Sequence, residues 1–202
     1  MIVIGIVGLI SSGKTTLCET VSKNGFKIIN LDILSHDVYQ VGSEPYNEII
    51  NTWGPEVLDE KKEISRSFLA EKVFRKEDDG INKLEKIVWP HLIIKLEEKL
   101  KEYHQEKVIF VEGAKILNSE FVKYCNKIWC VVSSIENIKE RIFSTALDHR
   151  NLLERLKNQI NEYTHLTGID EFIENNSTRQ DFDNNVKLLL EKIRKEYFND
   201  SK

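Results

Sequence analysis

The sequence predicts an α/β fold in which one parallel sheet of five strands lies between two layers of helices. Two observations lead to this class. Short runs rich in Ile and Val recur along the chain, and stretches with a helical spacing of apolar residues separate most of them. Such alternation is typical of parallel sheets, whose strands are buried on both faces. At 202 residues, the chain is long enough for one such core with additions.

The first expected strand, residues 2–7, consists almost entirely of Ile and Val, as is usual for a strand at the centre of a sheet. Leu17 and Val21 then mark one face of a helix, and Gly25 stands where a C-terminal helix cap belongs. The further strands are expected at residues 26–29, 108–111, 128–132 and, with a weaker pattern, 169–173.

The stretch from about residue 35 to 103 breaks this alternation and reads as helices only. Between residues 81 and 100, apolar side chains recur at steps of three and four, which predicts one buried helical stripe. Pro90 lies inside this stripe and is expected to kink or split the helix. A second stripe near the C-terminus follows Ser177 and Gln180, which fit a capping box.

Composition and charge exclude several classes of protein. A net charge of −4 is a poor footprint for a general nucleic-acid binder, which needs a basic face. The three cysteines are odd in number and form no Cys-x-x-Cys, so we expect neither a disulfide framework nor a zinc site, but small packing side chains in a reducing cytosol. The apolar N-terminal run lacks a basic leader and is too short to span a bilayer. We therefore expect a cytoplasmic protein without nucleic-acid or membrane partners.

The strongest motif is GLISSGKT at residues 8–15, which matches G-x-x-x-x-G-K-[ST]. Gly8 and Gly13 let the loop curl so that backbone N–H groups converge on phosphate oxygens, and the helix that follows adds partial positive charge. Lys14 can then reach the β- and γ-phosphates, while the Thr15 hydroxyl can ligate Mg²⁺. Because the motif follows a buried strand and opens a helix, we interpret it as a phosphate-binding P-loop.

Two carboxylates follow expected strands, at the edge of the sheet where α/β proteins bind ligands. Asp32 could accept a proton from an acceptor hydroxyl or hold Mg²⁺ through water, and it could equally be the N-cap of the next helix. Glu112 could contact Mg²⁺ or the acceptor, or cap the helix after it. The residue pattern leaves both alternatives open at each position.

A basic segment follows the fourth expected strand. Phosphoryl transfer needs positive charge around the γ-phosphate, and arginine forks supply it. The alternative is a set of exposed side chains on a solvated helix, which the segment taken alone favours. His36 and His91 are isolated histidines near the helical stretch, and a structural role is the default for each. The basic segment contains Arg141, His149, Arg150, Arg155 and Lys157.

Taken in order, these features resemble those of the dephospho-coenzyme A kinases. The opening IGIVGLISSGKTTLCETVSKNGFKIIN, continued by LD and ILSH, is similar to the P-loop, first helix and Asp-x-Asp segment of that family. The segments VGSEPYNEI, WGPEVLDE, ISRSFLAEKVF and LEKIVWPHL are similar to its substrate-domain signatures, in the same order. RLKNQ is similar to the far side of its lid, and IDEFIENNS to its last strand and the loop beside adenine. The resemblance runs along essentially the whole chain.

The resemblance implies an ATP-dependent phosphorylation of the ribose 3′-hydroxyl of dephospho-coenzyme A, with ATP bound as its Mg²⁺ complex. Asp32 would orient this hydroxyl and take its proton, and Arg141 would neutralise the transferring phosphoryl group. His36 and Glu112 would lie beside the acceptor. The residues expected to hold ATP are Gly8, Ser11, Ser12, Gly13, Lys14, Thr15, Thr16, Arg155, Asn175 and Asn176.

The resemblance also implies a three-layer P-loop fold with an acceptor-binding insertion and a lid. We expect a monomer or weak homo-oligomer. The expected ranges are 1–34, 104–137 and 166–202 for the core, 35–103 for the insertion and 138–165 for the lid. Two other functions stay open: a kinase for another nucleoside or nucleotide, and a P-loop protein that binds ATP without catalysis.

This chain departs from the family pattern at several positions. Asn30 stands where the first acid of the Asp-x-Asp pair is usual, and Trp89 where a histidine precedes the proline. Residues 112–115, Glu-Gly-Ala-Lys, replace a Pro-Leu-Leu segment. Ile138 and Thr145 replace a lid glutamine and a lid arginine, and we expect His149 or Arg150 to take the place of that arginine.

Overall fold

The computed structural model describes residues 1–74, 79–145, 149–163 and 167–198. The chain divides into two compact units. Unit 1 consists of Met1–Ile29 and Tyr103–Lys202, and unit 2 of Asn30–Glu102.

A five-stranded parallel sheet forms the centre of unit 1, with the strand order β2-β3-β1-β4-β5. β1 lies in the middle and pairs with β3 and β4, which aligns Ile4 with Phe110 on one side and with Lys127 on the other. All five expected strands are therefore confirmed. The strands are β1 (Ile2–Gly8), β2 (Lys27–Asn30), β3 (Val108–Glu112), β4 (Lys127–Val132) and β5 (Glu171–Glu174).

The last strand begins later than the sequence pattern predicted. Asp170 stands just before it, and its carboxylate accepts a hydrogen bond from the Ile128 N–H at 2.7 Å. Its own N–H donates to the Ile128 carbonyl at 2.9 Å. Since a side chain closes the edge of the sheet at this point, the regular ladder starts only at Glu171.

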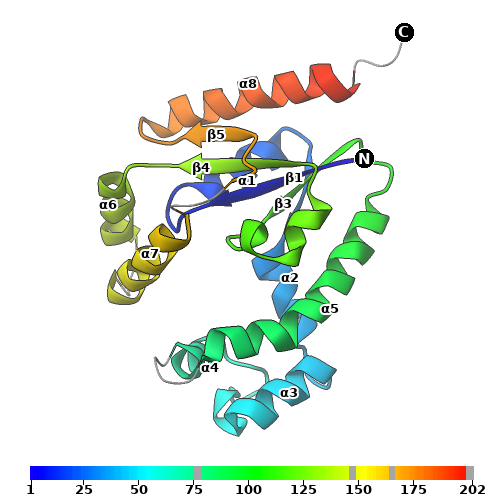
Figure 1. The fold of residues 1–202 in the computed structure, drawn as a ribbon, viewed down its shortest axis with the longest axis vertical. Helices are drawn as coiled ribbons and strands as arrows, with labels where there is room; N and C mark the ends of the chain where they lie inside the picture. Colours follow the sequence, from blue (N-terminus) through cyan, green and yellow to red (C-terminus); the bar gives the residue numbers. More distant parts are fainter. Residues whose placement is uncertain (75–78, 146–148, 164–166, 199–202) are drawn as a thin grey trace. The chain divides into compact units, whose positions relative to one another are not determined.

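Helices α1 and α8 cover one face of the sheet (Figure 1). Leu17 of α1 and Phe182 of α8 are fully buried against Ile4, Ile6 and Phe110 of the strands. Gly25 has the left-handed backbone expected beyond the end of α1 and donates to the Ser22 carbonyl at 2.9 Å. The helices of unit 1 are α1 (Lys14–Lys23), η2 (Ile116–Asn118), η3 (Glu120–Tyr124), α6 (Ile135–Thr145), α7 (His149–Tyr163) and α8 (Arg179–Phe198).

The N-cap of α8 lies one residue beyond the predicted one. The Thr178 hydroxyl, rather than that of Ser177, accepts a hydrogen bond from the Asp181 N–H at 3.2 Å and donates to the Asp181 carboxylate at 2.7 Å. The partner is therefore Asp181 rather than Gln180. The second bond joins two side chains, whereas in a capping box the later side chain accepts from the backbone N–H of the N-cap. Thr is about as good an N-cap as Ser, so spacing alone could not choose between the two.

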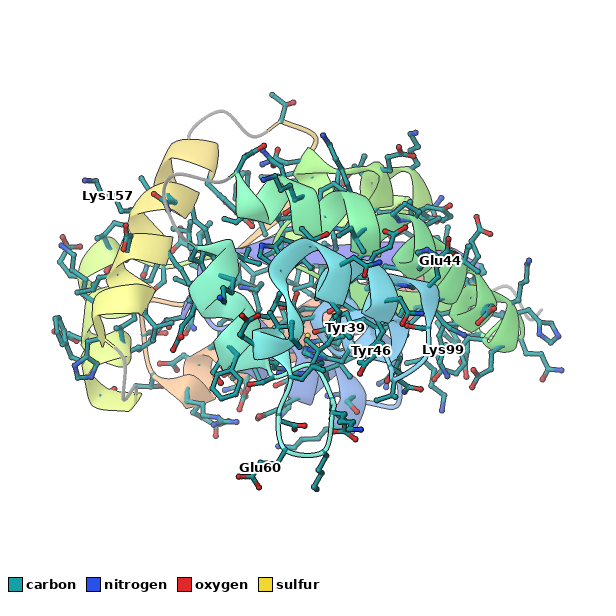
Figure 2. The ribbon with its side chains drawn as sticks, turned by 90° about the horizontal axis from the view of Figure 1, so that it is seen from below. Tyr39, Glu44, Tyr46, Glu60, Lys99 and Lys157 are labelled. Atoms are coloured by element: carbon teal, nitrogen blue, oxygen red, sulfur yellow. The ribbon has the colours of Figure 1, made fainter. Side chains whose placement is uncertain are left out.

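Unit 2 is mostly helical, and polar side chains fix where three of its helices begin. Asn30, Ser43 and Ser65 each accept a hydrogen bond from a backbone N–H in the first turn of the helix that follows. The expectation of helices only was wrong in one detail, because Leu58 and Ile64 form an antiparallel bridge. Glu60 lies on the turn that this bridge closes and points away from the unit (Figure 2). The helices are α2 (Leu31–Val38), α3 (Glu44–Trp53), η1 (Pro55–Val57), α4 (Arg66–Val73) and α5 (Gly80–Glu102).

Pro90 does not split its helix. α5 continues through it as one element of 23 residues, and Figure 1 shows that this helix is bent along its course. A proline removes one backbone hydrogen bond and bends a helix, while the buried stripe of Val88, Leu92 and Leu96 holds the two halves in one element. In the part of the chain that the structure describes, no helix combines the length and the apolar character that crossing a membrane requires.

Candidate functional site

The loop between β1 and α1 has the backbone of a phosphate-binding nest. Ser11 and Gly13 have left-handed φ values of 56° and 114°, which turn successive N–H groups toward a common point. The Ser12 hydroxyl is fully buried and has no hydrogen-bond partner among the described residues. Lys14 opens α1, and its Nζ donates to the carbonyls of Gly8 and Leu9 at 2.9 and 3.0 Å. A buried hydroxyl, curled N–H groups and an ammonium group in one loop suit a phosphate chain.

Arg141 and Asn175 hold this loop from its outer side. Arg141 Nη1 donates to the carbonyls of Ser11 and Ser12 at 3.3 and 3.2 Å, and Asn175 Nδ2 donates to the Ser12 carbonyl at 2.8 Å. The C=O and N–H of a planar peptide point in opposite directions. With the Ser12 carbonyl fixed outward, the Gly13 N–H is turned to the opposite side, where a phosphate would bind.

The same network ties the ends of β4 and β5 together. Arg141 Nη2 donates to the Asn175 carbonyl at 2.7 Å, and the Ser133 hydroxyl donates to the same carbonyl at 2.8 Å. Asn176 Oδ1 accepts from the Ser134 N–H at 2.8 Å. The structure therefore joins Arg141 and Asn175 directly to the P-loop, whereas Asn176 contacts the loop after β4. Arg155, on α7, is exposed.

Glu112 lies at the end of β3 and is only 5 % exposed. The alternative that it caps the next helix is wrong, because η2 begins after Lys115 without a side-chain cap. Burial raises the pKa of the Cys18 thiol on α1 to about 12, the negative charge of Glu112 adds to this rise, and the positive charge of Lys14 opposes it. Glu112 and Lys14 therefore both act electrostatically on the same thiol.

The residues around the P-loop fit a hard divalent cation. Thr15 is exposed in the first turn of α1, so its hydroxyl is free to turn toward a metal, and oxygen is the ligand that Mg²⁺ prefers. Among the residues that the structure describes, no three His, Cys, Asp or Glu side chains lie close enough to form a protein-only metal site.

In unit 2, Asp32 is not the N-cap that one reading of the sequence allowed. Asn30 fills this position, and its Oδ1 accepts from the Ile33 N–H at 2.8 Å. Asp32 follows in the first turn of α2 with an exposed side chain. The departure at Asn30 is therefore compatible with the local fold, because Asn caps a helix about as well as Asp. Asp32 therefore does not cap this helix.

His36 belongs to a polar cluster with Tyr39 and Arg66. Its Nδ1 lies 3.0 Å from Arg66 Nε and 2.9 Å from the Tyr39 hydroxyl. A guanidinium is always a donor, so Nδ1 must accept, and a neutral His36 carries its proton on Nε2. Burial and the positive charge of Arg66 lower the pKa of His36. Sequence reasoning did not single out Arg66, although the segment ISRSFLAEKVF contains it.

The rest of the basic segment is only partly described. Lys157 points away from α7 (Figure 2), which agrees with a solvated side chain. The His149 ring packs edge-on against Phe143, with 5.2 Å between ring centroids. The side chains of Thr145 and Arg150 lie outside the described part of the chain, as does the last residue of the expected lid, His165.

Comparison with known proteins places this arrangement in a family. The model of the dephospho-CoA kinase family matches residues 2–181. A dephospho-CoA kinase of Fusobacterium nucleatum is 32 % identical over 194 residues, which cover 96 % of this chain and 99 % of that protein. One of Aquifex aeolicus is 27 % identical over 94 % of this chain and 96 % of its own. The solved dephospho-CoA kinase from Campylobacter jejuni has the same fold, with a TM-score of 0.71, 23 % identity and coverage of 96 % and 98 %.

Proposed function

This chain belongs to the dephospho-CoA kinase family and is an ATP-using kinase of dephospho-CoA; from this premise we propose how its residues divide the work. The P-loop of unit 1 holds the phosphates of ATP, and unit 2 supplies groups for the acceptor. The hydroxyl that receives the phosphoryl group is the ribose 3′-hydroxyl. Catalysis rests on positioning and on electrostatic stabilisation, as is usual for phosphoryl transfer.

The P-loop holds ATP through its backbone. The N–H groups of Ser11 and of residues 13–16, together with the Ser12 hydroxyl, bind the phosphate oxygens. Lys14 turns from the Gly8 and Leu9 carbonyls to the γ-phosphate. Arg141 acts mainly by positioning, because its hydrogen bonds to Ser11, Ser12 and Asn175 fix the outer side of the loop. Arg155 and Asn176 complete the nucleotide site.

The Thr15 hydroxyl holds Mg²⁺, with Glu112 close to the same end of the sheet. When bound, the cation neutralises charge on the phosphates and orients them. This role is supported by the exposed Thr15 hydroxyl in the first turn of α1, which is an oxygen donor of the kind that Mg²⁺ prefers.

The acceptor groups come from unit 2. Asp32 takes the proton of the 3′-hydroxyl, a role that is supported by its freedom from helix capping. His36 and Arg66 form a donor pair, since His36 presents Nε2–H and Arg66 a guanidinium fork. Such donors suit the phosphate oxygens of dephospho-CoA.

The observation that carries the proposal is the complete nest with Lys14 at its end. The test is the release of ADP from ATP and Mg²⁺, measured with and without dephospho-CoA, while ³¹P NMR identifies the phosphorylated hydroxyl. Lys14→Ala should lose several orders of magnitude in turnover, which corresponds to about 4 kcal/mol or more. Lys23→Ala is the matched control, because this lysine lies on the same helix and is exposed.

A folded Lys14→Ala protein with near-normal turnover would remove the P-loop from the mechanism. A product that carries phosphate at another hydroxyl would refute the assignment of the acceptor position. Lys23→Ala should keep the turnover of the unchanged protein.

A further inference from the structure

Helix α7 presents two polar side chains to the P-loop. Gln159 Oε1 accepts a hydrogen bond from the Ile10 N–H at 2.7 Å, and the Tyr163 hydroxyl accepts one from the Gly8 N–H at 2.9 Å. Residues four apart in a helix lie on the same face, so both contacts come from one side of α7. Gly8 and Ile10 form the part of the loop that comes directly from β1.

Apolar packing supports this contact. Ile138 and Ile142 of α6 and Leu156 of α7 form a buried cluster, against which Leu9 and Ile10 of the P-loop pack. The two helices are therefore packed onto the first half of the loop. In the second half, the Ser12 N–H donates to the Leu9 carbonyl at 3.2 Å, and the peptide between Ser12 and Gly13 turns the Gly13 N–H toward the phosphate side.

The Tyr163 hydroxyl makes a second hydrogen bond, which reaches a third segment. It donates to the Ala114 carbonyl at 3.0 Å, in the loop after β3. Ala114 lies two residues beyond the buried Glu112, inside the segment that replaces the Pro-Leu-Leu of the family. One hydroxyl thus joins the P-loop, α7 and the loop that carries Glu112, and it uses both its donor and its acceptor capacity.

Gly8 links this junction to the catalytic lysine. Its N–H is held by Tyr163, and its carbonyl accepts from Lys14 Nζ at 2.9 Å. Because any rotation of the backbone at Gly8 moves this carbonyl, Tyr163 also sets the direction from which Lys14 approaches the phosphates.

We propose that Tyr163 is a positioning residue for phosphoryl transfer, which keeps the P-loop in its phosphate-receiving conformation by bridging the Gly8 N–H and the Ala114 carbonyl. This inference rests on the proposed nucleotide role of the P-loop. It concerns the ATP side of the reaction, so the acceptor should be bound unchanged when the bridge is lost.

The test is Tyr163→Phe, which removes the hydroxyl and keeps the ring. Tyr46→Phe is the matched control, because the Tyr46 hydroxyl also donates to a backbone carbonyl, that of Lys62 at 2.7 Å, and both residues belong to unit 2. The measurements are kcat, the separate KM values for ATP and dephospho-CoA, the Kd for ADP by calorimetry, and Tm for both variants.

Tyr163→Phe should raise the KM for ATP and the Kd for ADP about fivefold to tenfold, because the Gly8 N–H and the Ala114 carbonyl lose their hydrogen-bond partner. The KM for dephospho-CoA should stay unchanged. Tyr46→Phe also removes one hydrogen bond, so it should lower Tm about as much as Tyr163→Phe does. It should leave the Kd for ADP unchanged. The contrary result is a Tyr163→Phe protein whose Tm falls as in Tyr46→Phe, while its Kd for ADP and KM for ATP equal those of the unchanged protein. This result would show that Tyr163 is merely structural.

Amide hydrogen exchange on the unchanged protein tests the bridge without any variant. The Gly8 N–H should exchange slowly in the absence of nucleotide, because it is hydrogen-bonded. Exchange at the rate of an open loop would overturn the inference even if Tyr163→Phe did not fold. ADP binding remains measurable if no acceptor-dependent turnover is found, so failure of the bridge and failure of the proposed function give different results.

Discussion

Gly13→Ala is the sharpest test of how the P-loop is built. Gly13 has a φ of 114°, where a side chain strains the backbone by about 1–2 kcal/mol. In addition, a Cβ at this position would overlap Asn175 Nδ2. Asn175 is buried and donates to the Ser12 carbonyl at 2.8 Å, so its displacement breaks that bond and leaves a buried amide without a partner. This second effect costs about 2 kcal/mol.

The two effects together predict a loss of about 3–4 kcal/mol in the free energy of unfolding, which lowers Tm by roughly 10 °C in a chain of this size. Gly25→Ala is the control. Gly25 has a φ of 85°, and nothing lies within 4 Å of the Cβ that alanine would add. It should therefore lose only the backbone part, about 1 kcal/mol or roughly 3 °C.

Thermal denaturation and ADP calorimetry of the two variants decide the question. Gly13→Ala should also weaken ADP binding at least tenfold, whereas Gly25→Ala should bind ADP normally. Equal losses of stability in the two variants would refute the packing of Asn175 against Gly13. In the double variant Gly13→Ala/Asn175→Ala, the added Cβ no longer meets the Asn175 amide. The loss in the free energy of unfolding should therefore be smaller than the sum of the losses in the two single variants.

Further outcomes follow from the contacts described above. Asp32→Asn should lower turnover about a hundredfold to ten-thousandfold and leave ADP affinity and Tm unchanged, because Asn30 caps the helix; wild-type turnover would end the general-base assignment. Arg141→Ala should lower Tm and ADP affinity together, whereas a fall in kcat alone would favour direct contact with the phosphoryl group. The folded protein lowers the pKa of His36 below its usual 6.5, so the unfolded chain takes up the proton first as the pH falls. The free energy of unfolding should therefore decrease below pH 6.5. Denaturation measured from pH 7.5 to 5 should show a smaller decrease in His36→Gln than in the unchanged protein. With its pKa raised to about 12, Cys18 should resist a thiol reagent at pH 8 in the native protein and react after denaturation.

The sequence predicted those parts of the molecule that follow from local pattern. Buried strands are continuous apolar runs, and the P-loop is a contiguous motif, so both could be recognised in the sequence alone. The helix caps were harder, because several neighbouring side chains are chemically suitable. Thus Asn30 rather than Asp32 caps α2, and Thr178 rather than Ser177 caps α8.

Contacts between distant segments could not be predicted from the sequence. Arg66 reaches His36 across 30 positions of the chain, and Tyr163 reaches Gly8 across 155. Neither pairing leaves a periodic signal, since each depends on how whole helices pack. The proposed roles of Asp32 and Lys14 came from motif and resemblance, whereas that of Arg141 came from its hydrogen bonds to the P-loop. All three stay predictions for the variants above.

The position of β1 also has a consequence for how the chain reaches its native state. β1 is synthesised first, yet both of its neighbours in the sheet, β3 and β4, come after the whole of unit 2 in the sequence. Asn30–Glu102 is contiguous, so it can fold on local contacts while β1 still lacks partners. Folding of this segment brings its ends together and lowers the entropy cost of closing β1 onto β3. We therefore expect the nucleotide site to form late in folding, after the segment between β2 and β3 has become compact.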